Sequence, residues 1–311
     1  MEEKKMLSYS PHIRDNTTTA KIMLDVILAL LPAAIAGIYF FGWNAAKVIL
    51  LSVAAAVGSE ALIQWLCKKK ITVSDGSAAV TGLLLAMTLP SSAPWYIPVI
   101  GAVFAIGVCK QSFGGLGQNF INPALAARAM LTIAWPTAMT AYSVPHAVDA
   151  VSSATQLAGL SAPAPQLFPI WDLLCGNVPG SLGETCKIAI LLGGIYLLVR
   201  KRISWHIPVA FLGAFAVFTL LAQPVSLLPY QILSGGLLLG ALFMATDYVT
   251  SPKGTLAKLI FGVGCGVITG VIRFYGGYNE GVCFAILLMN VATPLLERYC
   301  RPKRYGEKKR A

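Results

Sequence analysis

The chain has 311 residues, of which 56% are hydrophobic and only 12% are charged. Soluble domains carry about 25% charged residues, because charge keeps their surfaces hydrated, so this composition excludes an ordinary water-soluble protein. The formal net charge of +11 does not indicate nucleic-acid binding, since the lysines and arginines fall in short clusters between apolar runs. We therefore expect an all-α polytopic membrane protein in the lipid bilayer.

The apolar runs predict about ten transmembrane helices, several of them shorter than the roughly 20 residues that a full span needs. In chain order these helices cover residues 22–41, 45–66, 76–90, 95–108, 121–135, 185–199, 206–222, 230–245, 256–274 and 281–296. The N-terminal stretch has no apolar core followed by a cleavage site, so we expect the first span to act as an uncleaved signal anchor.

The basic residues indicate which ends of these helices face the cytoplasm. Cytoplasmic loops of membrane proteins are rich in Lys and Arg, and nearly all of the 24 Lys and Arg residues fall on one side if the N-terminus is cytoplasmic. The exceptions are Lys47, Arg128, Lys187 and Arg273. With ten spans, both termini are predicted to face the cytoplasm.

This topology divides the chain into three predicted parts. Residues 1–21 form a cytoplasmic segment, residues 22–297 the membrane domain, and residues 298–311 a basic cytoplasmic tail. Within the membrane domain, residues 136–184 contain no Lys or Arg and no continuous apolar run. We expect this long loop to lie outside the cytoplasm.

An internal repeat is visible in the membrane domain. Residues 76–88 resemble residues 234–246, and each stretch is followed by a glycine-rich span, a Gly-Gly turn and a further helix. The pattern predicts two inverted five-helix repeats, about 22–135 and 185–297, with a binding site near the midplane. Chance similarity between Gly/Leu/Ala-rich helices is the alternative explanation.

Five ionisable side chains fall within or at the ends of predicted spans, where charge is costly and often functional. We expect Asp25, Asp75 and Arg128 to reach the interface or to pair structurally, as Arg128 would with a carboxylate. Glu60 and Asp247 are the stronger candidates for an ion pathway, because short acidic side chains reach water poorly from within the bilayer. Their hypothetical role is to bind or pass a cation.

A glycine- and asparagine-rich stretch, GGLGQNFINP, opens the fifth predicted helix. Gly114 and Gly115 would let the backbone approach a flat ligand, and Asn119 and Asn122 offer amide groups to polar ring edges. The alternative is a tight turn in which an Asn-Pro pair starts a helix. The residues alone predict no catalytic group and no metal site.

Several stretches together resemble one membrane protein family. They are SDGSAAVTGLLLAMTLP (74–90), GGLGQNFINPALAARA (114–129), VDAVSSAT (148–155), PGSLGET (179–185), FMATD (243–247) and GVCFAILLMN (281–290). The chain is similar to the family that comprises the D subunit of the Rnf complex and the B subunit of the sodium-pumping NADH:quinone reductase. The short N-terminal segment favours the Rnf member of this family.

The resemblance implies a covalent flavin in the long loop. Thr155 would carry FMN through a phosphoester bond, installed outside the cytoplasm by a flavin transferase. The flavin attachment motif would include Asp149, Ser152, Ser153 and Ala154, with Ser153 at a place where the family often has Gly.

The same resemblance implies the remaining functional assignments. Asn119 and Asn122 match the stretch linked to a non-covalent riboflavin, and Glu60 and Asp247 match acidic positions linked to cation movement. The implied activity is electron relay in an ion-translocating ferredoxin:NAD oxidoreductase of the inner cell membrane, driving Na⁺ or H⁺. The partners would be the A, B, C, E and G subunits of the Rnf complex. A secondary transporter or channel of urea- or ammonium-permease-like architecture is the alternative function.

Overall fold

The computed structural model describes residues 17–145, 152–153, 156–160, 167–277 and 280–300. Within these ranges the secondary structure is helical apart from one very short β-ribbon. The α-helices are α1 (Thr19–Leu66), α2 (Ser77–Met87), α3 (Tyr96–Gly107), α4 (Pro123–Ala134), α5 (Pro136–Thr140), α6 (Gln156–Leu160), α7 (Ile170–Cys175), α8 (Lys187–Val199), α9 (His206–Ala222), α10 (Leu228–Leu233), α11 (Leu237–Leu239), α12 (Thr255–Tyr275) and α13 (Val282–Tyr299). Short 3₁₀ turns are η1 (Val73–Asp75), η2 (Gln111–Phe113), η3 (Leu182–Glu184) and η4 (Val225–Leu227), and η5 (Gly240–Met244) is a π-helical turn.

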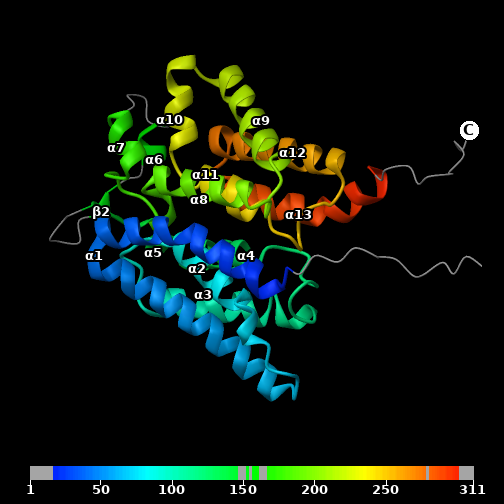
Figure 1. Ribbon diagram of the computed structural model, residues 1–311. Coiled ribbons are helices and arrows are strands. Elements are labelled where there is room, and N and C mark those ends of the chain that lie inside the picture. The colour runs from blue at the N-terminus through cyan, green and yellow to red at the C-terminus, as the bar shows by residue number, and fades with distance from the viewer. Residues whose placement is uncertain (1–16, 146–151, 154–155, 161–166, 278–279, 301–311) are drawn as a thin grey trace, which may run out of the picture.

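The long helix α1 consists of two helices joined at Gly42, whose backbone is left-handed with φ 64°. Only glycine adopts this region without steric cost, so Gly42 allows the chain to turn back between the two helices. Figure 1 shows the two parts of α1, dark blue and lighter blue, running back alongside each other. The first two predicted spans are therefore the two arms of this hairpin.

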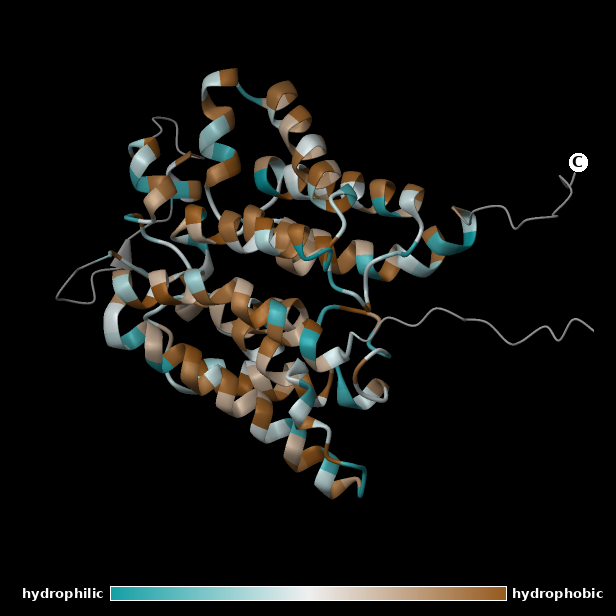
Figure 2. Ribbon diagram, in the orientation of Figure 1, coloured by the Kyte–Doolittle hydropathy of each residue, from teal (hydrophilic) through white to brown (hydrophobic). Residues whose placement is uncertain are grey.

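A helix lies at each of the predicted spans, and four helices are long and apolar enough to cross a membrane. These four are α1, counted as one, together with α12, α13 and the helix at Tyr96–Phe113. A fifth is possible if the segments Val225–Leu233 and Leu237–Met244, which are bent by 66°, form one broken span. Figure 2 shows hydrophobic residues along the long helices and hydrophilic residues gathered at loops and helix ends. The chain is a polytopic helical membrane protein.

The elements fall into two halves that pack against each other. Figure 1 places α1 to α4 in the lower half and α8 to α13 in the upper half. Helix α1 packs on α8, and α4 packs on α13, so these two pairs join the halves. The contact between α1 and α8 is close, because a Cβ atom at Gly193 would lie 2.1 Å from the carbonyl oxygen of Ala29.

Short elements fill much of the predicted long loop between the two halves. Strands β1 (Tyr142–Ser143) and β2 (Ser152–Ser153) pair antiparallel, so the fold departs from all-α by this one ribbon. In Figure 1, the elements α5, α6, α7 and β2 gather at one end of the molecule, and α13 ends at the opposite end.

Candidate functional site

A small cavity of about 60 Å³ lies where the two halves meet. Its polar lining comes from α2, the segment before α4, and the stretch after η5. The polar lining residues are Ser77, Thr81, Lys110, Asn119, Asn122 and Asp247. The structure thus brings together three of the predicted site residues, two from the first half and one from the second.

Asn122 is the N-cap of α4. Its side-chain Oδ1 accepts hydrogen bonds from the backbone N–H groups of Ala124 at 3.0 Å and Leu125 at 3.3 Å, and Pro123 occupies the first helical position. Both features favour a helix start, so the Asn-Pro alternative describes the local structure correctly. The amide Nδ2 of Asn122 donates to the carbonyl oxygen of Met244 at 3.2 Å, which ties α4 to the π-helical turn of the other half.

Asn119 is buried, and its Nδ2 donates to the carbonyl oxygen of Ile121 at 3.2 Å. Gly114 and Gly115 lie outside the cavity lining and form the turn that leads to it. Their φ angles are 116° and 101°, a region that favours glycine. The glycines therefore serve the turn, while Asn119 faces the cavity.

Asp247 lines the cavity from the second half. Its Oδ2 accepts a hydrogen bond from the Thr250 hydroxyl at 3.1 Å. The carboxylate is therefore held in position at the edge of a polar cavity.

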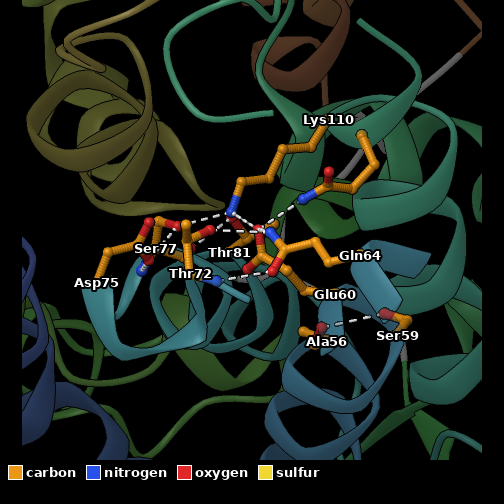
Figure 3. A network of polar contacts seen from close by, with 10 residues as sticks. Ala56, Ser59, Glu60, Gln64, Thr72, Asp75, Ser77, Thr81 and Lys110 are labelled. Atoms are coloured by element: carbon orange, nitrogen blue, oxygen red, sulfur yellow. Dashed lines mark hydrogen bonds and ion pairs between the residues drawn. The ribbon is translucent and has the colours of Figure 1, made fainter. Parts of the chain in front are cut away.

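Glu60 is buried in α1 and forms an ion pair with Lys110. Its Oε1 lies 2.8 Å from Lys110 Nζ and accepts a hydrogen bond from Gln111 Nε2 at 2.7 Å. Gln64 Nε2 donates to the same oxygen at 3.4 Å, and Figure 3 shows Lys110 and Gln64 pointing toward Glu60. The other oxygen, Glu60 Oε2, has no hydrogen-bond partner among the described residues. The structure gives Glu60 the lysine partner that its sequence position did not reveal.

Lys110 connects this ion pair to the cavity. Its Nζ donates to the Ser77 hydroxyl at 2.6 Å, and the Ser77 hydroxyl donates to Asp75 Oδ1 at 2.6 Å. Lys110 is only 2% exposed, although its position suggested a solvated loop lysine. Asp75 also accepts from the Ser77 backbone N–H at 2.8 Å, so its part in the network is structural.

A second buried charge cluster, formed by Arg128, Glu184 and Glu280, lies beside the break between α10 and α11. Arg128 pairs with Glu280 and lies 3.7 Å from Glu184. The Glu280 Oε1 atom accepts from the backbone N–H of Gly236 at 2.9 Å, at the break between α10 and α11. The interpretation that Arg128 pairs with a carboxylate is confirmed, and the pair also holds the broken helix.

Lys187 and Arg273 extend this second cluster. Lys187 Nζ donates to the carbonyl oxygens of Glu184 and Gly235. Arg273 donates to the carbonyl oxygen of Gln231 at 2.6 Å, and its guanidinium carbon lies 4.8 Å from the centre of the Phe215 ring. Both cations are buried. Sequence reasoning placed them at outer helix ends and missed their burial, because the backbone carbonyl groups that accept from them lie elsewhere along the chain.

Asp25 forms a third group, at the start of α1. Its carboxylate lies 2.6 Å from Arg202 Nε and 3.2 Å from Arg200 Nη2, and it accepts from the Tyr196 hydroxyl at 3.1 Å. This confirms the structural pairing expected for Asp25.

The predicted flavin attachment motif is only partly described. Asp149, Ala154 and Thr155 lie outside the described residues. The backbones of Ser152 and Ser153 pair with Ser143 and Tyr142 in the ribbon. Downstream of the motif, the Leu157 side chain packs close to Gly235, beside the second charge cluster.

Comparison with known proteins agrees with the resemblance seen in the motifs. The model of the NQR2, RnfD, RnfE family matches residues 6–306. One relative is the D subunit of the Na(+)-translocating ferredoxin:NAD(+) oxidoreductase complex of Acetobacterium woodii. The chain is 51% identical to it, over 96% of this chain and 95% of the relative.

Two further relatives have the same type of name. The chain is 42% identical to the D subunit of the proton-translocating ferredoxin:NAD(+) oxidoreductase complex of Clostridium ljungdahlii, over 97% of this chain and 96% of the relative. It is 37% identical to the D subunit of the ion-translocating oxidoreductase complex of Escherichia coli, over 97% of this chain and 99% of the relative. With nearly its whole length matched in these ways, the chain belongs to the NQR2, RnfD, RnfE family.

Proposed function

We propose that this chain is the D-type membrane subunit of an ion-translocating ferredoxin:NAD oxidoreductase complex in the cytoplasmic membrane. The observation that carries the proposal is the full-length similarity to proteins named as the D subunit of such complexes. Its partners are the A, B, C, E and G subunits of that complex and a flavin transferase. The relatives' names include both Na⁺ and proton translocation, so either cation is compatible with the family.

The proposed topology has ten spans in two inverted repeats, with both termini in the cytoplasm. Two packing features support it. The equivalent helices α1 and α8 contact each other across the halves, as do α4 and α13, which is the pattern expected around a two-fold axis. The short elements of the long loop lie at the end opposite the C-terminus of α13 (Figure 1).

The proposed redox group is FMN on Thr155. The support is the DAVSSAT sequence at 149–155, which an ion permeation pathway does not require. A flavin converts between two-electron and one-electron transfer, while the protein supplies position and electrostatics. In this chain, the paired backbone of Ser152–Ser153 precedes Thr155, and Leu157, which packs near Gly235, follows it.

The cavity between the halves suits an ion pathway better than a flavin. Its volume of about 60 Å³ accommodates about two water molecules at roughly 30 Å³ each, whereas pockets for ring-sized ligands occupy about 300–1,000 Å³. Its carboxylate, hydroxyl and amide groups are ligands that Na⁺ or water accepts. Riboflavin beside Asn119 and Asn122 does not fit the cavity at this size and stays a prediction from the resemblance.

The ion pathway proposal gives different parts to the two carboxylates. Asp247 would contact the cation directly, since it lines the cavity. Glu60 would act through Lys110, whose ammonium group lies between Glu60 and the cavity. Lys110 thus supplies a fixed positive charge next to the proposed path of the translocated cation.

The covalent flavin is tested by in-gel fluorescence of the denatured full-length chain. We expect flavin fluorescence in the wild type and in Ser153→Ala, and none in Thr155→Ala. Fluorescence that persists in Thr155→Ala would exclude attachment at this residue. A chain that never carries flavin, in the presence of its transferase, would favour a transporter or channel instead.

The ion pathway is tested in vesicles that contain the assembled complex. Asp247→Asn and Glu60→Gln should lower cation uptake driven by ferredoxin oxidation, while the in-gel flavin signal stays unchanged. Glu297→Gln is the matched control, because Glu297 is an exposed acid outside the cavity lining. Uptake at the wild-type rate in both test variants would refute the proposal.

A further inference from the structure

A basic cavity of about 280 Å³ lies at the ends of α9 and α12, separate from the site between the halves. It is formed by the turn before α9 and by the segment that connects η5 to α12. Its polar lining residues are Arg202, Ser204, Thr246, Tyr248, Ser251, Lys253 and Lys258. Three cations and four hydroxyl-bearing residues line one space. The Thr246 and Tyr248 hydroxyls donate to the carbonyl oxygens of Leu242 and Arg202, so the donors that suit a phosphate group are the cations and the Ser204 and Ser251 hydroxyls.

The positive charge of the basic cavity is only partly compensated. Lys253 and Lys258 form no ion pair with any residue that the structure describes. Arg202 uses its Nε on Asp25, but Asp25 is shared with Arg200. The neighbouring acid, Glu297, accepts a hydrogen bond from the backbone N–H of Lys253 at 3.2 Å. An excess of positive charge remains for a bound anion.

An apolar groove of about 600 Å³ lies between the same two helices. Its lining runs from Val209 through Gly213 to Leu221 on α9 and from Leu259 to Val267 on α12. The groove begins two residues beyond Ile207 on α9 and one residue beyond Lys258 on α12, both of which line the basic cavity.

Helices α9 and α12 run parallel, because their contacts advance together along both helices. The N-terminal ends of both helices lie at the basic cavity. A Cβ atom at Gly262 would lie 2.8 Å from the Ile207 carbonyl oxygen, and one at Gly266 would lie 2.6 Å from the Phe211 carbonyl oxygen. At 1.5 Å per residue, the groove from Val209 to Leu221 is about 18 Å long. This length is close to one leaflet, half of the roughly 30 Å hydrocarbon core.

The surroundings place the basic cavity at a membrane–water interface. Trp205, which precedes α9, is 57% exposed and stacks on His206, and Tyr248 at the cavity is 44% exposed. Exposed Trp and Tyr side chains gather at the level of the lipid headgroups. Val209 and Leu256, just inside the two helices, are exposed and apolar, as lipid-facing residues are.

We propose that the basic cavity and the apolar groove together bind one anionic phospholipid, with its phosphate in the cavity and an acyl chain along the groove. A free phosphate would satisfy the cavity but not the groove. An apolar helix of a partner protein could fill the groove but would leave the lysines unpaired. A phospholipid carries both chemistries on adjoining atoms. The proposal is independent of the flavin and of the ion pathway.

The test is native mass spectrometry of the full-length chain in a neutral detergent, titrated with phosphatidylglycerol or phosphatidylcholine. We expect phosphatidylglycerol to bind more tightly. Lys253→Gln with Lys258→Gln should weaken phosphatidylglycerol binding about 30-fold, roughly fivefold for each lysine. Replacing both lysines with Arg should preserve binding. The matched control is Lys69→Gln with Lys70→Gln, which removes the same charge at exposed positions and should change nothing.

Two further experiments distinguish a bound phospholipid from free phosphate in the basic cavity. Gly213→Leu fills the groove at a position where a Cβ atom meets nothing within 4 Å, so it should weaken both lipids without disturbing the fold. Inorganic phosphate should not displace the lipid at millimolar concentration. Equal effects of the test and control pairs, full displacement by phosphate, or an assembled complex without this lipid would each overturn the proposal.

Discussion

Lys110 Nζ lies 2.8 Å from Glu60 Oε1, and both side chains are at most 2% exposed. Taking two charges out of water costs several kcal/mol for each ion, and only good geometry with further hydrogen bonds offsets that cost. Here Ser77 accepts from the lysine, and Gln111 donates to the carboxylate. The buried pair therefore joins α1 to the segment after α3 and borders the cavity between the halves.

Breaking this pair should destabilise the protein strongly. Lys110→Met leaves Glu60 buried without its cation, at a cost of about 3–5 kcal/mol. We expect a large drop in the thermal unfolding temperature of the detergent-solubilised chain, measured by the loss of the monodisperse size-exclusion peak after heating. The double variant Lys110→Met with Glu60→Gln should recover most of it. Lys69→Met, at an exposed position, is the control, and a loss of the same size there would contradict the assignment.

Asn122 should act both as a helix cap and as a bond between the halves. Asn122→Ala removes the cap of α4, which costs about 0.5–2 kcal/mol, and also the bond to Met244. Asn122→Ser keeps a capping oxygen but cannot donate across to Met244. Hydrogen exchange at the π-helical turn, Gly240–Met244, should therefore rise in both variants, while exchange in the first turn of α4 rises only in Asn122→Ala. Unchanged exchange at 240–244 would show that the cross-half bond does not hold this turn.

Glu280 should hold the break between α10 and α11. Glu280→Ala removes both the partner of Arg128 and the acceptor for the Gly236 N–H. Glu280→Gln removes the charge but retains an oxygen for Gly236. We expect faster hydrogen exchange at 236–239 in the alanine variant than in the glutamine variant. Equal exchange in the two variants would mean that the charge, and not the hydrogen bond to Gly236, orders the break.

The interface between α1 and α8 should reject any side chain at Gly193. A Cβ atom there would lie 2.1 Å from the Ala29 carbonyl oxygen, so Gly193→Ala forces the two helices apart. We expect poor accumulation of folded protein in the membrane and a lowered unfolding temperature. Gly58→Ala is the control, because a Cβ atom at Gly58 meets nothing within 4 Å, and replacing a helical glycine stabilises by about 0.5–1 kcal/mol. A well-folded Gly193→Ala chain would refute the close approach.

Much of the fold was predictable from the sequence, because spans, turns and caps are local. Apolar runs indicated where the helices lie, and the Asn-Pro pair at 122–123 indicated where α4 begins. The departure was the ribbon of Tyr142–Ser143 with Ser152–Ser153. Two-residue strands bury too little to leave a periodic signal.

The site was predictable only in part. Asn119, Asn122 and Asp247 line one cavity where the two halves meet, but Gly114 and Gly115 stay outside its lining. Lys110 was missed, because a lysine next to a predicted span reads as a cytoplasmic loop residue. Its burial depends on a carboxylate 50 positions away in the sequence, and no local pattern records such a partner.

The sequence by itself determined that this is a helical membrane protein and which family it resembles, since hydropathy and motifs are properties of short stretches. The distribution of Lys and Arg among the loops also predicted which loops face the cytoplasm. Only the tertiary structure decided how charges inside the membrane domain are neutralised. Glu60 meets Lys110, and Arg128 meets Glu280. A buried charge is tolerated only beside its partner, and chain packing, not spacing along the chain, brings those partners together.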